Sequence, residues 1–509
     1  MNDSLQHPGA PLSQGALNAP MAYPGLRVVV LGLARQGIAA SRFFLAEGAR
    51  ITISDLRGEE QLAAAHAALE RYVAETRPSG TLHFALGGHP LSLLDDADLL
   101  CLSGGVSPAT PIVQEAARRG IPLTNDGLLT LQHCRAPIVG LTGSAGKTTT
   151  TTLVGLMLQA AGCTVHVGGN IGTPLLDHLA DVGAGDRVVM ELSSFQLELF
   201  DRSPSIAALL NITPNHLDRH PSMSHYAAAK ANILCFQGRS DTCVLNADDA
   251  YTGPWLRRGR CEIPAGEGQA AVYFPLQGTR LGFSLVAEVE AGAFLRGDAL
   301  IWRRRGEDDV EICRAHEVRL RGRHNLANIL AACCVAGATG ADAPALRAVA
   351  TTFGGVAHRL QIVRERNGVL WINDSIATAP ERTVAALRSF SEPIVALLGG
   401  RDKHLPWAEC AAEIHGRCAD GQPRVRHAIL FGEAADLIAE ALAQHVRSSG
   451  DIPVPVTRCA DLSEAVDAAA RVAQTGDVVL LAPGGTSFDA YEDFAARGHH
   501  FVALVETLP

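Results

Sequence analysis

The stretch Ile138-Val-Gly-Leu-Thr-Gly-Ser-Ala-Gly-Lys-Thr148 decides the fold class of this chain. Its first four residues, Ile138–Leu141, form an apolar run that predicts a buried strand, and the residues that follow the stretch predict a helix ending near Gly162. Between strand and helix, glycines allow backbone N–H groups to turn inward around phosphate oxygens. Lys147 can reach the terminal phosphates of a nucleotide, and the hydroxyl of Thr148 can bind Mg²⁺. This arrangement is typical of a phosphate-binding loop in an α/β domain.

The loop departs from the strict phosphate-loop pattern at one position. That pattern, G-x-x-x-x-G-K-[ST], requires glycine at position 141, where this chain has leucine. The plain alternative is a Gly-Ser turn that joins a strand to a helix carrying a lysine by chance. Because the flanking strand and helix are both evident, we predict a shorter variant of the loop that binds nucleotide phosphates.

The composition excludes several other classes of protein. Of the 509 residues, 47% are hydrophobic and 19% are charged, which is ordinary for a globular protein and unlike a disordered one. The formal net charge of −10 disfavours a general nucleic-acid binder, which needs a basic surface. The apolar runs are shorter than a membrane helix, and the N-terminus lacks the pattern of a signal peptide. The twelve scattered cysteines form no Cys-x-x-Cys pair, which favours reduced thiols. We therefore expect a cytoplasmic protein, with a monomer as the working hypothesis.

Three blocks of the chain alternate short apolar strands with Ala- and Leu-rich helical patterns, which predicts parallel sheets. We therefore expect an α/β protein with three domains in series after a disordered extension at residues 1–24. Residues 25–135 are expected to form a Rossmann-like domain. Residues 136–354 are expected to form a P-loop ATPase domain with a parallel sheet, and residues 355–509 a second Rossmann-like domain.

Residues 251–320 and the end of the third block depart from the regular alternation of strands and helices or complete it. Residues 251–320 of the central block show short alternating stretches and weak helix signals, so we expect a small antiparallel subsheet there. In the third block, the last predicted strand is Asp477–Leu481, and the last predicted helix is Ser487–Gly498.

Polar residues follow two of the strands predicted in the central block. Glu191 comes directly after the apolar run Val188–Met190, and His216 follows the predicted strand Ile206–Ile212. Ligands gather beyond the carboxyl ends of parallel strands, and Mg²⁺ prefers hard oxygen donors. On these residues alone, a solvated Glu191 is an equally good interpretation, and a structural role is the more common one for a lone histidine. Both stay open at this point.

Three further features have plain alternatives. Asn170 lies in a glycine-rich turn and is otherwise a turn former, and Lys230 in a helical run reads as a surface lysine. In the first block, Gly32-Leu-Ala-Arg-Gln-Gly37 is followed by a strand that ends at Asp55. That pattern alone would suggest a dinucleotide-dependent oxidoreductase. The second phosphate loop makes this interpretation secondary.

Eight motifs occur together and in one order, and together they resemble the Mur ligases over roughly residues 25–509. Each motif alone is moderate evidence, whereas eight in register are very specific. Within the family, they are most similar to the members that add glutamate to UDP-N-acetylmuramoyl-L-alanine. The motifs are Gly143-Ser-Ala-Gly-Lys-Thr-Thr149, Gly168-Gly-Asn-Ile-Gly172, Glu191-Leu-Ser-Ser-Phe-Gln-Leu197, Asn215-His-Leu-Asp-Arg-His220, Ala227-Ala-Ala-Lys230, His324-Asn-Leu-Ala-Asn328, His358-Arg359 and Asn373-Asp-Ser375.

The resemblance implies a domain for the UDP moiety, a central ATPase and a C-terminal domain that brings the amino acid and closes on ATP. It implies ATP contacts at Gly143, Ser144, Ala145, Gly146, Lys147, Thr148, Thr149, Asn325, Asn328, Arg359 and Asp374. It implies contacts to the UDP substrate at Arg35, Gln36, Asp55, Arg57, Asn170, Ser193 and His216. It implies two Mg²⁺ ions held by Thr148, Glu191, His216 and Lys230, the last as a carbamate.

The implied reaction begins with transfer of the γ-phosphoryl group of ATP to the substrate carboxylate, which makes an acyl phosphate. The amino group of glutamate then displaces phosphate. Such a transfer depends on positioning and charge neutralisation, so the residues implied for catalysis are charged or metal-binding. They are Lys147, Glu191, His216, Lys230 and Arg359.

The glutamate side departs from the usual family segment Asp-Ser-Lys-Ala-Thr-Asn. This chain has Asp374-Ser-Ile-Ala-Thr-Ala379, so Ile376 replaces a lysine. The other glutamate contacts that the resemblance implies are kept, and D-glutamate is favoured over L-glutamate. These contacts are Thr378, Lys403, Ser487 and Phe494.

Three other hypotheses belong to different reactions or classes. A folate polyglutamylating ligase would share the ATPase core without a domain for UDP. A phosphate-loop ATPase that drives motion would not depend on a ligation substrate. A non-catalytic UDP-sugar-binding regulator would tolerate the loss of Lys147.

Overall fold

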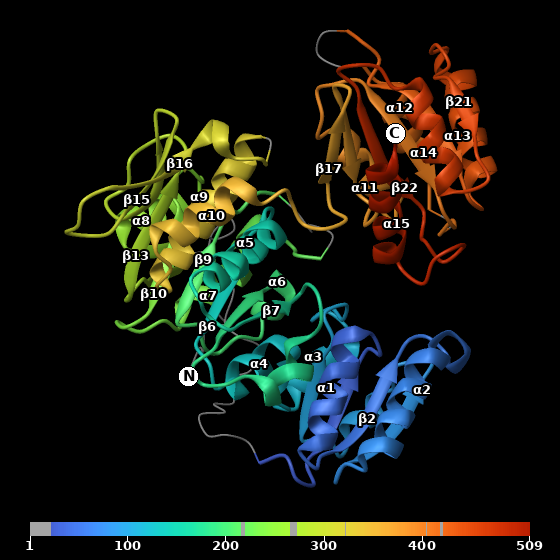
Figure 1. The fold of residues 1–509 in the computed structure, drawn as a ribbon. Coiled ribbons are helices and arrows are strands. Elements are labelled where there is room, and N and C mark those ends of the chain that lie inside the picture. Colours follow the sequence, from blue (N-terminus) through green and yellow to red (C-terminus); the bar gives the residue numbers. More distant parts are fainter. Residues whose placement is uncertain (1–21, 215–218, 265–271, 321, 404, 418–420) are drawn as a thin grey trace. The chain divides into compact units, whose positions relative to one another are not determined.

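The computed structural model describes residues 22–214, 219–264, 272–320, 322–403, 405–417 and 421–509. The chain divides into two compact units, residues 1–353 and residues 354–509. Each unit is an α/β structure built on its own sheets (Figure 1). No helix among the described residues is long and apolar enough to cross a membrane.

The first sheet has five parallel strands in the order β3-β2-β1-β4-β5. Its alternating side chains pack into two cores, one of which also includes Tyr23. Tyr23 was assigned to the disordered extension, but it is 4% exposed and its hydroxyl bonds His133. The elements are β1 (Arg27–Leu31), α1 (Arg35–Ala46), β2 (Arg50–Asp55), α2 (Glu59–Thr76), β3 (Thr81–Leu86), β4 (Leu99–Leu102), α3 (Pro111–Arg118), β5 (Leu123–Asn125) and α4 (Asp126–His133).

The second sheet has nine strands in the order β16-β15-β14-β13-β10-β9-β6-β8-β7. Along this order, each strand from β14 to β7 is parallel to its neighbours within that part of the sheet. β15 and β16 continue the sheet beyond β14 with antiparallel pairing. The elements before residue 251 are β6 (Ile138–Thr142), α5 (Lys147–Ala160), β7 (Val165–Gly169), β8 (Arg187–Glu191), α6 (Ser194–Leu197), β9 (Ile206–Leu209), α7 (Met223–Cys235) and β10 (Thr242–Asn246).

The prediction of antiparallel strands at 251–320 is confirmed for β11 with β12 and for β14 to β16, but most of this segment is not a subsheet of its own. β13 pairs in parallel with β10, so the segment extends the main sheet into a mixed one. β14 approaches β13 closely at Gly292, where a Cβ would lie 1.8 Å from the carbonyl oxygen of Gly282. Only β11 and β12 stand apart, as a two-stranded antiparallel sheet among the described residues. The elements are α8 (Thr252–Arg258), β11 (Arg260–Ile263), β12 (Val272–Pro275), β13 (Thr279–Ser284), β14 (Gly292–Arg296), β15 (Ala299–Arg303), β16 (Val310–Arg314), α9 (Arg323–Ala338) and α10 (Ala343–Thr352).

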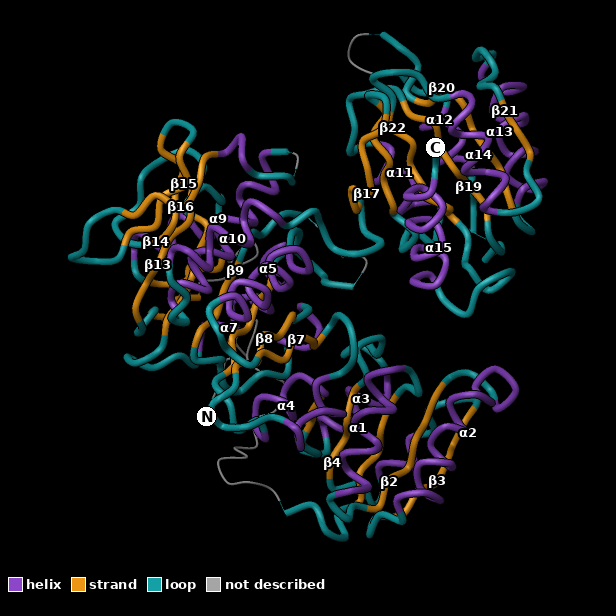
Figure 2. The backbone as a smooth tube through the Cα atoms, in the orientation of Figure 1, coloured by secondary structure: helices purple, strands orange, loops and turns teal. Residues whose placement is uncertain are grey.

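The unit of residues 354–509 has a six-stranded sheet in the order β17-β18-β22-β19-β20-β21, with helices on both faces (Figure 2). Only β17 is antiparallel to its neighbour, so this sheet is also mixed. Alternate residues of β18 enter different cores: Leu370 and Ile372 enter one, Val369 and Trp371 the other. The elements are β17 (Gln361–Arg366), β18 (Val369–Asn373), α11 (Pro380–Leu387), β19 (Ile394–Gly399), α12 (Ala408–Ile414), β20 (Val425–Phe431), α13 (Ala435–Ser449), β21 (Val456–Arg458), α14 (Leu462–Val472), β22 (Val478–Gly484) and α15 (Phe494–Thr507).

The predicted helix Ser487–Gly498 was placed too early. Helix α15 begins at Phe494, because the carboxylate of Asp493 accepts the backbone N–H of Ala496 at 2.7 Å and caps the helix there. Residues between β22 and Asp493 therefore form a loop at the carboxyl edge of the sheet.

Candidate active site

The phosphate loop joins β6 to α5 at the carboxyl edge of the central sheet. Gly146 has φ +81°, a left-handed conformation that favours glycine, and a Cβ there would lie 2.2 Å from Oδ1 of Asn328. Lys147 opens α5, and its Nζ donates to the carbonyl oxygen of Gly143 at 2.9 Å. The loop thus leaves no room for side chains where phosphate oxygens would approach the backbone.

A carboxylate and a hydroxyl meet beside the loop. Thr148 Oγ1 donates to Glu191 Oε2 at 2.9 Å, and Asn170 Nδ2 donates to Glu191 Oε1 at 3.1 Å. Glu191 is 2% exposed at the end of β8, so the interpretation of a solvated strand-end glutamate does not hold. Thr148 and Glu191 together offer the hard oxygens that Mg²⁺ prefers, and this donor set fits the ion.

Lys230 is buried and lies against the same loop. The prediction of a surface lysine from the residues alone was wrong, because Lys230 is 1% exposed on α7. Its Nζ donates to the carbonyl oxygen of Gly143 at 2.9 Å and lies 4.7 Å from the ring centre of Tyr226. Burial lowers the pKa of Lys230 well below its ordinary value, the charge of Lys147 lowers it further, and Glu191 opposes this. The amine is thus driven towards its neutral form.

The residues that hold the loop in place were not identified from the sequence. Asn211 accepts the backbone N–H of Ala145 at 2.9 Å and donates to the carbonyl oxygen of the same residue at 3.1 Å. The hydroxyl of Ser144 donates to the carbonyl of Thr213 and accepts from the hydroxyl of Tyr226 at 3.1 Å. The signal for Asn211 was its position just after the apolar run of β9, at the edge where ligands gather.

Other predicted residues of the central part lie on neighbouring elements. Asn325 and Asn328 are on the first turns of α9, where Asn328 Nδ2 donates to Asn325 Oδ1 at 3.1 Å. Ser193 caps α6 through a reciprocal contact with Gln196. His216 lies outside the described residues. Among the residues that are described, no group of three or more His, Cys, Asp or Glu could hold a metal ion.

In the first sheet, Asp55 joins two loops. Its carboxylate accepts the backbone N–H of Leu33 at 2.8 Å and two side-chain bonds from Arg57, at 3.0 and 2.8 Å. Arg57 holds the pKa of Asp55 well below its usual range. Gln36, predicted to bind substrate, accepts the backbone N–H of Gly104 at 2.9 Å, while Arg35 opens α1.

In the second unit, Asp374 follows β18 and is 6% exposed. Its Oδ1 accepts the backbone N–H of Leu360 at 3.0 Å. Burial raises the pKa of Asp374 to about 6, against the opposing effects of the Leu360 bond and the charges of Arg359 and Arg382. The chain around Arg359 is unusual, since His358 and Leu360 both have positive φ, +63° and +43°.

Predicted glutamate-binding residues lie on loops at the carboxyl edge of the second unit's sheet. Lys403 Nζ donates to Thr378 Oγ1 at 3.3 Å, and burial lowers the pKa of Lys403. Ser487 is 2% exposed, and Phe494 opens α15. Arg497, which was not identified from the sequence, is fully buried and donates to the carbonyl oxygens of Ser375, Gly485 and Thr486, so it holds these loops together.

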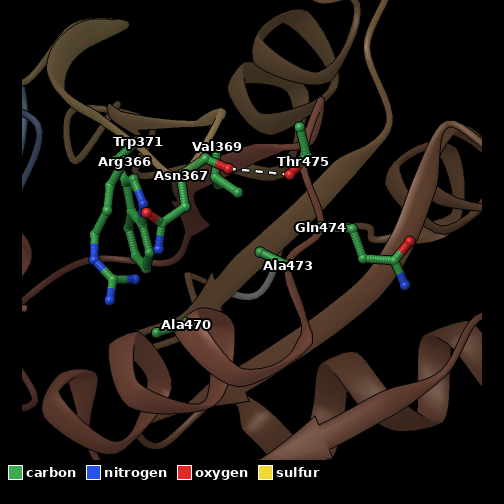
Figure 3. A pocket seen from close by; sticks show the side chains of 8 residues that line it. All are labelled: Arg366, Asn367, Val369, Trp371, Ala470, Ala473, Gln474 and Thr475. Atoms are coloured by element: carbon green, nitrogen blue, oxygen red, sulfur yellow. Dashed lines mark hydrogen bonds between the residues drawn. The ribbon is translucent and has the colours of Figure 1, made fainter. Parts of the chain in front are cut away.

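A cavity of about 370 Å³ lies at the opposite, amino edge of that sheet (Figure 3). It is lined by residues before and within β18, by the end of α14 and by the segment after α14, including Asn367, Trp371 and Gln474. The hydroxyl of Thr475 donates to the carbonyl oxygen of Asn367 at 3.1 Å across it. None of the predicted site residues lines this cavity.

Three family models match successive parts of the chain. They are the "Mur ligase MurD-like, N-terminal domain" at residues 26–125, the "Mur ligase middle domain" at 141–336 and the "Mur ligase, glutamate ligase domain" at 358–485. A UDP-N-acetylmuramoylalanine–D-glutamate ligase of Symbiobacterium thermophilum is 40% identical over 482 residues, which cover 95% of this chain and 98% of that protein. This chain belongs to the Mur ligase family.

Other members of the family agree with this assignment. A UDP-N-acetylmuramoylalanine–D-glutamate ligase of Acetivibrio thermocellus is 36% identical over 488 residues, covering 95% of this chain and 96% of that protein. The crystal structure of a UDP-N-acetylmuramate–alanine ligase of Thermotoga maritima has a TM-score of 0.50 at 17% identity, covering 95% of this chain and 99% of that one. At that identity the likeness concerns the fold alone. The predicted fold class, three α/β domains of a Mur ligase, is therefore confirmed.

Proposed function

We propose that this chain joins the amino group of D-glutamate to the carboxylate of UDP-N-acetylmuramoyl-L-alanine, with conversion of ATP to ADP and phosphate, in peptidoglycan synthesis. The observation that carries the proposal is the 40% identity to a UDP-N-acetylmuramoylalanine–D-glutamate ligase along nearly the whole length of both chains. The choice of D- over L-glutamate follows the relatives' names and agrees with the expectation from the sequence.

The phosphate loop supports the first step of this reaction. A carboxylate is a poor electrophile because its oxygen is a poor leaving group. A substrate carboxylate oxygen bonds to the γ-phosphorus of ATP as the bond to ADP breaks, and the resulting acyl phosphate has phosphate as a leaving group. Lys147 and the loop's N–H groups stabilise the charge that develops on the transferred group.

The residues around Glu191 would position the metal and the acyl substrate. Thr148 and Glu191 would hold one Mg²⁺ ion, and we propose His216 and a carbamylated Lys230 for a second. Bound Mg²⁺ offsets negative charge on phosphate oxygens. Asn170, bonded to Glu191 at 3.1 Å, would hold the carbonyl side of the substrate.

The remaining assignments rest on the family resemblance. Asn325 and Asn328 are proposed for the adenine, Arg359 for the γ-phosphate and Asp374 for the ribose. Arg35, Gln36, Asp55, Arg57, Ser193 and His216 are proposed for the UDP substrate. In the second step the amine of glutamate attacks the acyl carbon, phosphate leaves with the bond electrons and the amine gives up a proton. Thr378, Lys403, Ser487 and Phe494 would hold glutamate for this attack.

The test is an assay of phosphate release with each substrate omitted in turn. We expect release to require UDP-N-acetylmuramoyl-L-alanine and D-glutamate together, with L-glutamate far less effective. Release without either substrate would favour an ATPase that drives motion, and acceptance of a folate in place of the UDP substrate would favour the polyglutamylating alternative. Absence of any ATP turnover would favour the non-catalytic regulator. Size-exclusion chromatography tests the proposed monomer.

A further inference from the structure

Arg219, which precedes α7, reaches the loop that follows β4 of the first sheet. Its Nη2 donates to the carbonyl oxygen of Gly105 at 3.1 Å. The neighbouring residue Gly104 donates its backbone N–H to Oε1 of Gln36, in the first turn of α1, at 2.9 Å. Because consecutive Cα atoms are about 3.8 Å apart, the guanidinium of Arg219 lies close to the start of α1. The UDP substrate is proposed to bind there through Arg35 and Gln36.

Stacked rings hold the Arg219 guanidinium in this place. Its Cζ lies 4.9 Å from the ring centre of Phe195. The rings of Phe195 and His220 are parallel within 4°, with their centres 5.2 Å apart. His220 is 1% exposed, and its ring nitrogens lie 2.9 Å from Ser194 Oγ and 3.2 Å from Glu198 Oε1. The orientation of the guanidinium is therefore set before any ligand binds, which reduces the entropy that binding would cost.

The charge of Arg219 has no partner of opposite sign in the part of the chain that the structure describes. The bond to Gly105 uses one of the five N–H groups of the guanidinium, and Nε is buried without a hydrogen-bond partner. The side chain is half-buried. Partial removal of a cation from water raises its free energy unless an anion or several acceptors compensate. An anionic ligand would supply this compensation.

The start of α1 suits an anion as well. A helix N-terminus presents unpaired backbone N–H groups and a partial positive charge, and both favour phosphate. No acidic residue lies in the first turn of α1. The nearby carboxylate of Asp55 is already bonded to Arg57 and to the backbone N–H of Leu33. The UDP substrate has one anionic group that fits between Arg219 and this helix end, the diphosphate that joins its uridine to its sugar.

We propose that Arg219 binds the diphosphate of the UDP substrate, together with the backbone N–H groups at the start of α1. The inference rests on the proposed function for the identity of the ligand and adds a substrate-binding residue to it. Arginine suits this role because its planar group can donate two parallel bonds to phosphate oxygens.

The first test is Arg219→Ala in the full chain, with the affinities for UDP and for uridine measured separately by NMR titration. Loss of a charge-assisted phosphate contact predicts about 10- to 100-fold weaker binding of UDP. Uridine has no phosphate, so its affinity should not change. KM for UDP-N-acetylmuramoyl-L-alanine should rise by a similar factor, with KM for ATP unchanged.

Arg187→Ala is the matched control. Arg187 is also half-buried and donates to the backbone carbonyl oxygens of Gly185 and Asp186, but it lies at the amino end of β8. We expect this variant to bind UDP and uridine as the wild type does. Arg219→Lys keeps the cation without the planar group, so it should bind UDP at least about threefold more tightly than Arg219→Ala.

Three results would overturn the proposal. They are an unchanged affinity of Arg219→Ala for UDP, an equal loss of UDP and uridine binding, which would indicate a structural role, and a lysine variant that binds UDP no better than the alanine variant. A wild-type protein that binds UDP through Arg219 but does not ligate D-glutamate would refute the proposed function and leave the diphosphate contact standing.

Discussion

Replacing Asp374 by asparagine is expected to stabilise the second unit above neutral pH while weakening ATP binding. Burial raises the pKa of Asp374 from 3.8 to about 6. The folded protein binds the proton of this carboxyl more tightly than the unfolded chain does. The resulting contribution to folding stability is fully present below the pKa of the unfolded state, and it is lost as the pH rises through the pKa of the folded state. At 1.36 kcal/mol per pKa unit, the folded state loses about 3 kcal/mol by pH 8, and about half of this has been lost by pH 5.

Asparagine stays neutral at both pH values and its Oδ1 can still accept the N–H of Leu360. The difference in stability between Asp374→Asn and wild type should therefore grow by about 1.5 kcal/mol between pH 5 and pH 8. Amide hydrogen exchange of peptides covering β18 (Val369–Asn373) measures this stability difference in the full chain. Comparing the variant with the wild type at the same pH cancels the intrinsic exchange rates.

Asp493→Asn is the matched control for this measurement. Asp493 is an exposed aspartate that caps α15, and asparagine caps helices about equally well, so we expect no pH-dependent difference in exchange. If the Asp374→Asn difference is independent of pH, or if the variant exchanges faster at pH 8, the reasoning about the buried carboxyl is refuted. A rise in KM for ATP alongside the gain in stability would support the assignment of Asp374 to the nucleotide.

Three further predictions concern the phosphate loop. Lys147→Ala should lower kcat at least about 100-fold with the fold intact, and retention of more than about a tenth of the wild-type rate would contradict its role. Lys230→Arg should also lower kcat at least about 100-fold, because arginine cannot become an anionic oxygen donor. The wild-type protein equilibrated with isotopically labelled bicarbonate should show a carbamate signal by NMR that the variant lacks. Absence of this signal from both proteins would refute carbamylation. Gly146→Ala should abolish ATP binding in calorimetry, because φ is +81° and the new Cβ would lie 2.2 Å from Asn328 Oδ1; unchanged affinity would show that the loop can rearrange.

Local patterns predicted most strands and helices because each depends on residues close in sequence. The phosphate loop and its flanking strand and helix are one such case: Ile138–Thr142 and Lys147–Ala160 match the expected elements within two residues. The sequence predicted antiparallel strands at 251–320, as found for β14 to β16, but not the parallel pairing of β13 with β10, because that pairing joins β13 to the main sheet through the fold of the whole domain. Periodicity identified these strands as β structure but did not indicate that β13 would pair with β10.

The candidate site shows the same division between residue type and environment. The order of motifs singled out Glu191 and Lys230, but their burial could not be read from it. As a lone lysine in a helical run, Lys230 reads as a surface residue, whereas every residue of its helix from Tyr226 to Leu234 is buried. Asn211 and Arg497 were missed because they bind backbone carbonyls and N–H groups of loops that only the folded chain brings near them.

Lys147 of the phosphate loop and Lys230 of α7 share one acceptor, and this supports the proposed carbamylation of Lys230. Lys147 Nζ and Lys230 Nζ each donate to the carbonyl oxygen of Gly143 at 2.9 Å, so two ammonium groups would repel each other across one oxygen. Burial adds to this and favours a neutral Lys230, which is the form that attacks CO₂. Carbamylation would convert this neutral amine into an anion beside Glu191. The charged side chains around the loop would then be net negative, which favours binding of a second divalent cation, while Lys147 keeps its charge for phosphate.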